Sequence, residues 1–156
     1  MRVKVIGGGL AGSQAALVLA KNGIDIELYE MRPDKQTGAH KTGNFAEIVC
    51  SNSLGSKELT VASGLLKEEL RILGSDLINV ADNCKVGAGG ALAVDREIFS
   101  DKINELINNN PYIKVIRGEV DNSVFCYAQD DYIVMELESF GVTTGKDIMS
   151  YLDCYP

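Results

Sequence analysis

The first thirty residues constrain the fold of this chain more than any other part of it. A short β-rich stretch at residues 3–6 runs into the glycine turn of residues 7–12, which fits G-x-G-x-x-G. An Ala- and Leu-rich helical run follows at residues 13–21, and an alternating second strand at residues 24–29 ends at Glu30. A glycine pattern alone is weak. Strand, glycine turn, helix, strand and acid in this order indicate a dinucleotide-binding βαβ unit.

The residue types in this unit each have a physical reason. Gly7 allows a sharp turn, Gly9 lets a pyrophosphate approach the backbone, and Gly12 lets the helix pack closely on the sheet. The start of the helix presents N–H groups and about half a unit of positive charge to phosphates. A carboxylate at Glu30 can bind both ribose hydroxyls and would repel a 2′-phosphate, which disfavours NADP. The pattern does not separate FAD from NAD. The predicted cofactor-binding residues are Gly7, Gly8, Gly9, Leu10, Ala11, Gly12 and Glu30.

Composition narrows the class of protein. The 156 residues are enough for one domain with a hydrophobic core, and no apolar run approaches the roughly 20 residues of a membrane span. The N-terminus has no signal-peptide pattern, so we expect a cytoplasmic protein. Cys50, Cys84, Cys126 and Cys154 lack metal-ligand spacing, and we expect no metal site. The net charge of −7 argues against general nucleic-acid binding, because phosphate contacts need Lys and Arg.

The middle of the chain predicts further α/β elements. Apolar spacing predicts a helix over residues 65–73 that ends at Gly74. A glycine-rich turn at residues 86–91 precedes a second helix, which Asp95 caps and which runs to about Asn108. A third strand at residues 114–117 is expected to lie parallel to strands at residues 2–6 and 25–29. The predicted fold class is therefore α/β, a Rossmann-like FAD-binding domain with a parallel three-layer core.

The sequence pattern changes in the last part of the chain. We predict two parts, residues 1–121 as the N-terminal portion of the FAD-binding domain and residues 122–156 as a divergent tail. Within the tail, residues 124–129 and 132–137 are expected to form a β-hairpin, and residues 145–152 a short helix. No motif that carries chemistry occurs there.

The stretch at residues 45–54 is the second feature of interest. Cys50 lies among Ser51, Asn52 and Ser53, whose hydroxyl and amide donors can stabilise a thiolate. Judged from the residues alone, a buried and inert cysteine is the favoured interpretation. His40, the only histidine, is more often a loop hydrogen-bonding residue than a catalyst.

Five segments in this order resemble a known family. They are residues 30–33 (Glu-Met-Arg-Pro), 39–40 (Ala-His), 45–54, 62–67 and 89–96. Together they closely resemble the N-terminal part of the folate- and FAD-dependent tRNA (uracil-5-)-methyltransferases, over most of residues 1–121. Gly87 departs from the resemblance, because it stands where the family pattern has a proline.

The resemblance implies a reaction. The family forms 5-methyluridine in the T-loop of tRNA, with methylenetetrahydrofolate as carbon donor, FAD as carrier and reductant, and NAD(P)H to reduce the flavin. A thiolate that adds to uracil C6 activates C5 for attack on a methylene electrophile. Cys50 matches the first of two functional cysteines in the family, the one beside the flavin. The second lies in a region absent here, so the resemblance implies a fragment that is inactive alone.

Two alternatives remain open from the sequence. One is another FAD-dependent oxidoreductase, which the glycine turn and Glu30 fit equally well but the Cys50 segment does not. The other is a non-enzymatic nucleotide-binding remnant. Bound flavin in the purified protein would exclude the nucleotide-binding remnant. Methylation of tRNA would separate a member of the methyltransferase family from another oxidoreductase.

Overall fold

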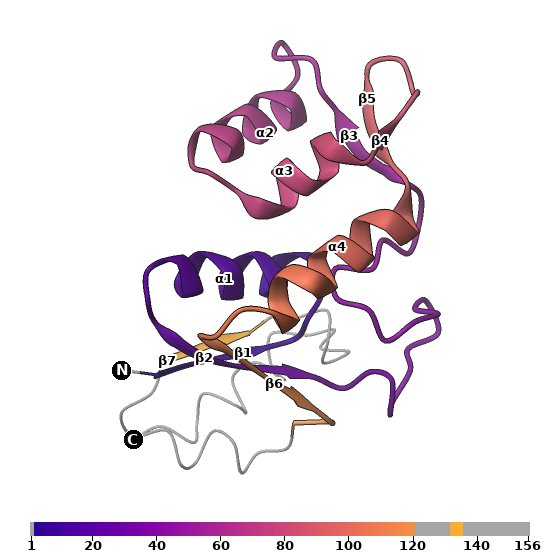
Figure 1. Ribbon diagram of the computed structural model, residues 1–156. Helices are drawn as coiled ribbons and strands as arrows, with labels where there is room; N and C mark the ends of the chain where they lie inside the picture. The colour runs from indigo at the N-terminus through magenta and orange to yellow at the C-terminus, as the bar shows by residue number, and fades with distance from the viewer. Residues whose placement is uncertain (1, 121–131, 136–156) are drawn as a thin grey trace, which may run out of the picture.

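A parallel β-sheet forms the base of the molecule (Figure 1). The computed structural model describes residues 2–120 and 132–135. Adjacent strands of this sheet pair in parallel in the order β6-β2-β1-β7. This confirms the predicted parallel α/β class, and the second strand continues one residue further than expected, to Glu30. The strands are β1 (Arg2–Ile6), β2 (Asp25–Glu30), β6 (Ile113–Arg117) and β7 (Tyr132–Met135).

Two helices cover one face of this sheet, α1 (Leu10–Lys21) and α4 (Arg96–Asn108) (Figure 1). The core between helices and sheet is apolar, and full burial of each such side chain contributes about 1.5–3 kcal/mol. Asp95 caps α4 as predicted, because its carboxylate accepts hydrogen bonds from the N–H groups of Glu97 and Ile98, both at 3.1 Å. Side chains that are fully buried in this core include Val5, Leu28, Phe99, Ile103 and Ile107.

A second unit stacks on these helices and forms a further tier (Figure 1). It combines two helices with a small antiparallel sheet of order β3-β5-β4. The helix predicted at residues 65–73 begins three residues earlier, at Ala62. The predicted glycine turn at residues 86–91 connects β4 to β5. The unit contains α2 (Ala62–Ile72), α3 (Asp76–Asn83), β3 (Ser53–Ser56), β4 (Lys85–Val86) and β5 (Ala91–Val94).

Strand β7 joins the parallel sheet from far along the chain. Its residues pair with β1 from Val3 opposite Tyr132 to Ile6 opposite Met135. The expected strand at residues 132–137 is thus confirmed over four residues, with β1 as a parallel neighbour. The other arm of the expected hairpin, residues 124–129, and the expected helix at residues 145–152 lie outside the described residues. Because β1 lies between β2 and β7, the strand order reverses at β1, where open α/β sheets bind their ligands.

Candidate functional site: the glycine loop and the Cys50 pocket

The glycine loop leaves the carboxyl end of β1 at this reversal point. Gly7 has a φ of +100°, a conformation that favours glycine, and its N–H donates to the carbonyl of Tyr29 at 2.9 Å. Helix α1 then begins at Leu10 with Gly9 as its N-cap. The N-cap residue makes no side-chain hydrogen bond to this end of the helix, and the first turn of the helix has no acidic residue. Such a helix N-terminus suits an anion, as the sequence predicts.

Gly8 is a tightly packed position in the loop. A Cβ atom there would lie 2.6 Å from Cδ1 of Phe45 and 2.8 Å from Oε2 of Glu30. Phe45 is fully buried, so its ring has little room to move away. The sequence interpretation placed the close approach at Gly9. The structure adds Gly8, where the protein's own side chains leave no space.

The Glu30 carboxylate is buried at the end of β2, with the residue only 4% exposed. It accepts hydrogen bonds from the N–H of Gly8 at 2.9 Å and from the N–H of Arg32 at 2.9 Å. The Arg32 side chain adds donors from Nε at 2.8 Å and Nη2 at 3.0 Å. Burial raises the pKa of Glu30, but the bonds from Arg32 and Gly8 outweigh burial and hold the pKa below its ordinary value. The carboxylate is therefore ionised at neutral pH.

Arg32 contacts a second carboxylate, which the sequence analysis did not pair with it. Its Nη1 donates to Oε2 of Glu47 at 3.2 Å. Glu47 also accepts from the N–H of Lys41 at 3.0 Å and from the N–H and Oγ1 of Thr42 at 3.2 and 3.0 Å. Burial raises the pKa of Glu47, and the bonds from Lys41 and Thr42 bring it below its ordinary value. Arg32 thus ties the end of β2 to the following loop.

The stretch that leads to Cys50 is anchored on the glycine loop. The N–H of Ala46 donates to the carbonyl of Gly8 at 2.9 Å. Ala46 is fully buried and has a φ of +51°, which is costly for a residue with a Cβ. The structure therefore ties the segment that carries Cys50 to the glycine loop at a point four residues before Cys50.

Arg117, at the end of β6, fixes the same stretch from the other side. Its guanidinium lies 4.3 Å from the centre of the Phe45 ring, within the range of a cation–π contact. Its Nη1 donates to the carbonyls of Arg32 and Gly43 at 2.7 and 2.8 Å. The third parallel strand thereby supports both the Arg32 loop and the aromatic ring beside Gly8.

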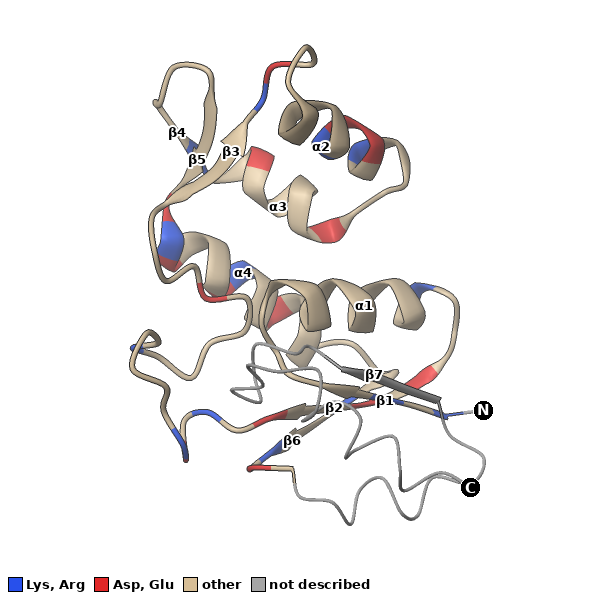
Figure 2. Ribbon diagram, turned by 180° about the vertical axis from the view of Figure 1, so that it is seen from behind, with Lys and Arg blue, Asp and Glu red and all other residues tan. Residues whose placement is uncertain are grey.

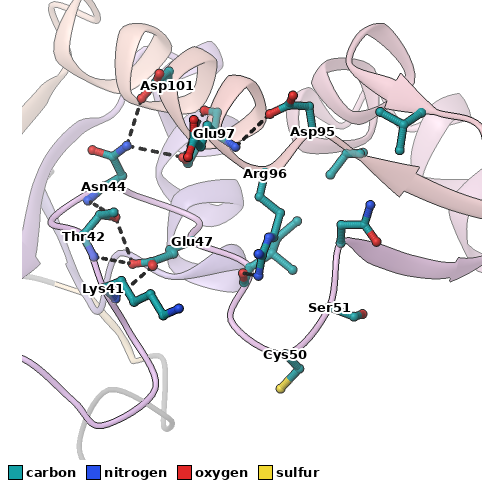
Figure 3. A pocket seen from close by; sticks show the side chains of 15 residues that line it. Lys41, Thr42, Asn44, Glu47, Cys50, Ser51, Asp95, Arg96, Glu97 and Asp101 are labelled. Carbon is teal, nitrogen blue, oxygen red and sulfur yellow. Dashed lines mark hydrogen bonds between the residues drawn. The ribbon is translucent and has the colours of Figure 1, made fainter.

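Cys50 is exposed and lies in the wall of a pocket of about 820 Å³ (Figure 3). The favoured interpretation from the residues alone, a buried cysteine, is therefore wrong at this position. The opposite wall comes from the start of α4, where Arg96 Nη1 lies 3.5 Å from the carbonyl of Ile48. Other residues that line the pocket include Lys41, Thr42, Asn44, Glu47, Ser51 and Asp95.

Cys84 and His40 do not line this pocket. Cys84 is buried, and burial raises the pKa of its thiol, so it is a packed and unreactive residue. His40 hydrogen-bonds to Thr37 through Nδ1 and does not line the pocket. Cys126 and Cys154 lie outside the described residues.

The described part of the chain contains no candidate membrane span and no candidate metal site. None of its helices is both long enough and apolar enough to span a membrane. Across residues 2–120 and 132–135, no group of three or more His, Cys, Asp or Glu side chains is arranged to hold a metal ion.

Comparison with known proteins identifies the family. The family described as glucose inhibited division protein A matches residues 2–148. The chain belongs to this family. The match includes the glycine loop, Glu30, Arg32 and Cys50, and it supports FAD as the dinucleotide of this site.

Curated relatives match over the N-terminal part. Methylenetetrahydrofolate–tRNA-(uracil-5-)-methyltransferase TrmFO of Persephonella marina is 60% identical over 119 residues, which are 76% of this chain and 27% of the relative. The TrmFO of Natranaerobius thermophilus is 61% identical over 120 residues, 77% of this chain and 28% of the relative. The chain thus spans little more than a quarter of the length of these relatives. A crystal structure of a mutant of MHPCO aligns with 73% of this chain and 31% of its own, with 18% identity and a TM-score of 0.41, a likeness that carries no argument.

Proposed function

We propose that this chain forms the FAD-binding portion of a tRNA (uracil-5-)-methyltransferase, with Cys50 as its flavin-proximal thiol. The observation that carries the proposal is the 60% identity to TrmFO over 119 residues, joined to a fold that connects the glycine loop with the Cys50 pocket. The proposal divides residues 1–121, which hold both features, from residues 122–156.

The residues of the site fit a dinucleotide. The turn at Gly7 and the start of α1 place the backbone of Gly9, Leu10, Ala11 and Gly12 at the carboxyl end of β1, where this kind of fold binds a pyrophosphate. The N–H of Gly8 is already donated to Glu30, so Gly8 serves by its small size. The Glu30 carboxylate is ionised and lies at the end of β2, where a ribose diol can donate to it.

In the proposed reaction, bound FAD supplies the redox chemistry and carries the one-carbon unit. The chain's own residues then bind and orient. The glycine loop holds the pyrophosphate, Glu30 holds the ribose, and Cys50 presents its thiol from the pocket wall. Methylenetetrahydrofolate and NAD(P)H are the proposed cosubstrates, and the compartment is the cytoplasm. Parts of the relatives beyond the matched quarter supply the remaining groups, so the chain is inactive alone.

The substrate proposed from the relatives' names is tRNA, and the distribution of charge bears on it. Seven of the 22 acidic side chains and one of the 15 basic side chains follow residue 120. The net charge of −7 therefore arises mainly after residue 120. In the described part, Lys and Arg are interspersed with Asp and Glu (Figure 2). The portion that resembles TrmFO thus lacks the acidic excess that disfavours contact with phosphates.

The first test is binding. The full chain is titrated with FAD, and with ADP as the half that lacks the flavin, by calorimetry. Glu30→Gln should weaken both by about tenfold or more, because a hydrogen bond to a charged group contributes about 1.5–3 kcal/mol. Glu58→Gln is the control, because Glu58 lies between β3 and α2. Equal affinity of wild type and Glu30→Gln would contradict the assignment of the ribose site.

The second test is activity. Reduced FAD, methylenetetrahydrofolate and an unmodified tRNA transcript are mixed with the chain in a single turnover. We expect no 5-methyluridine from the chain alone. If 5-methyluridine forms, and if Cys50→Ala abolishes it, the chain is active on its own. That result would overturn the proposal that other parts of the relatives supply groups that the reaction needs.

A further inference from the structure

Arg32 lies between the nucleotide half-site at Glu30 and the pocket at Cys50. Its side chain is 3% exposed and contacts Glu30 at 2.8 Å and Glu47 at 3.2 Å. Glu47 and Cys50 both line the pocket. The series of contacts Glu30–Arg32–Glu47, called the Arg32 bridge below, therefore joins the two sites through two buried charges and one partly buried charge.

At one end of the bridge the Glu30 carboxylate is already saturated. A carboxylate accepts about four hydrogen bonds. Those of Glu30 come from the N–H of Gly8 and from the N–H, Nε and Nη2 of Arg32. A ribose hydroxyl that donates to Glu30 must displace or share one of these donors. The two backbone donors are held by the glycine loop and by the end of β2, so the guanidinium is the donor that can move.

At the other end a movement of Arg32 reaches the pocket wall. Glu47 is held by Arg32 and in turn holds the N–H groups of Lys41 and Thr42. Lys41, Thr42 and Glu47 line the pocket together with Cys50. Arg32 is 2% exposed, so water does not readily replace a contact that it gives up. A shift of the guanidinium at Glu30 must therefore be taken up at Glu47.

We propose that Arg32 is a positioning residue that couples occupancy of the ribose site at Glu30 to the arrangement of the pocket wall that carries Cys50. The inference rests on the proposed function, because it requires an adenosine ribose at Glu30. Arginine suits this role, since its planar fork serves two carboxylates at once, whereas a lysine offers a single point charge.

The test uses ADP, which carries no isoalloxazine ring to cover Cys50. Alkylation of the full chain by iodoacetamide is timed with and without saturating ADP. Peptide mass spectrometry separates Cys50 from the other cysteines. We expect ADP to change the rate at Cys50 by about fivefold or more, the lower end of typical coupling between sites. Calorimetry measures ADP binding in the same samples.

Three variants separate positioning from mere stability. In Arg32→Lys, ADP should still bind but should no longer change the rate at Cys50. Glu47→Gln removes the negative charge at the far end of the bridge, leaves the bonds between Arg32 and Glu30 in place, and should lose the effect with ADP affinity near that of wild type. Arg71→Lys is the matched control, because Arg71 also pairs with two carboxylates, Glu68 and Asp82, but lies away from the bridge. It should keep the full effect.

The outcomes are distinct. If wild type does not bind ADP, the proposed nucleotide site fails and the coupling fails with it. If wild type binds ADP with no change at Cys50, or if Glu47→Gln keeps the full effect, the nucleotide site stands and the coupling is overturned. Should Arg32→Lys fail to fold, Glu47→Gln alone decides.

Discussion

The parallel-sheet unit and helix α2 of the antiparallel unit bury their apolar side chains to very different extents. Leu28 of β2 is fully buried beneath α1 and α4, and so is Val5 of β1. On α2, by contrast, Leu66 is 56% exposed and Ile72 is 79% exposed, and Leu73 at its end is 80% exposed. The core of the parallel-sheet unit continues into α3 and β5, because Leu77 and Val94 belong to the same buried cluster. The antiparallel unit leaves one helix face uncovered, so its stability depends on fewer contacts.

The ion pairs of Arg32 and Arg71 also differ in burial, and those of Arg32, in the parallel-sheet unit, are again the more buried. Arg32 in the parallel-sheet unit is 3% exposed and holds two carboxylates, whereas the Arg71 side chain, which ties α2 to Asp82 of α3, is 28% exposed. Exposed pairs contribute about 0–1 kcal/mol, whereas breaking a buried pair costs several times more. The parallel-sheet unit is therefore the more rigid of the two, and the site residues lie on it or on loops tied to it.

The largest expected change in stability comes from truncating a leucine in the parallel-sheet unit, compared with truncating one in the antiparallel unit. Leu28→Ala should lower the free energy of unfolding by about 2–5 kcal/mol, because it opens a cavity in a closed core. Leu73→Ala should change it by no more than about 0.5 kcal/mol. Urea unfolding followed by circular dichroism measures both. A similar loss from both variants would break the comparison.

A glycine in the antiparallel unit tests where that unit is tight. A Cβ at Gly64 would lie 2.0 Å from the carbonyl oxygen of Glu58, which is backbone and cannot swing aside. Gly64→Ala should cost about 1–3 kcal/mol even though alanine is the better helix former. Gly38→Ala, where nothing lies within 4 Å, is the control. Hydrogen exchange should localise the loss to α2, and unchanged protection there would contradict the prediction.

The pH dependence of stability should report on the parallel-sheet unit. The folded pKa of Glu30 is lowered, so its contribution is present above the unfolded value of roughly 4.3 and is lost as pH falls through the folded value. Each unit of such a shift corresponds to about 1.4 kcal/mol. Urea midpoints at pH 7 and pH 3 should therefore fall further for wild type than for Glu30→Gln. A steeper fall in the variant would reverse the sign and refute the pairing with Arg32.

The smallest expected effect is a gain. Ala46 has a φ of +51°, and an L-residue there costs roughly 1–2 kcal/mol. Ala46→Gly should stabilise the protein by at most about 1 kcal/mol, since the greater freedom of glycine in the unfolded chain offsets part of the relief. Ala88→Gly is the control in the antiparallel unit. Ala88 is not among the described residues with a positive φ, so this substitution relieves no strain and should destabilise the protein slightly. Thermal melting resolves the two signs.

The two units also differ in how far their sequences predict them. The βαβ unit was predictable because its signals are local: a glycine turn, an apolar helix face and a terminal acid at Glu30. The cap at Asp95 was predictable for the same reason. Helix α3 has only eight residues and β3 reads Ser-Leu-Gly-Ser, too short and too weak in propensity to recognise.

Within the site, the residue types were predictable but their partners were not. The match of Cys50 to a family motif pointed to the pocket. The exposure of Cys50, however, depends on the path of residues 45–50, which the hydrogen bond from Ala46 to Gly8 anchors. The pairing of Arg32 with Glu47 joins residues 15 positions apart across an irregular loop, where no periodicity operates. Such contacts are set by tertiary packing.

The position of β7 has a consequence for the order in which the chain folds. Strand β1 precedes β7 by more than a hundred residues, and its pairing with β7 must wait until residue 135 has been made. Until then β1 has β2 on one side and an open hydrogen-bonding edge on the other, the kind of edge that invites pairing with foreign strands. Closing this edge requires a contact that spans most of the chain, and such contacts form slowly. A nascent chain of this protein therefore carries an open strand edge next to the glycine loop until β7 has been made, and such an edge is prone to pair with other chains in that interval.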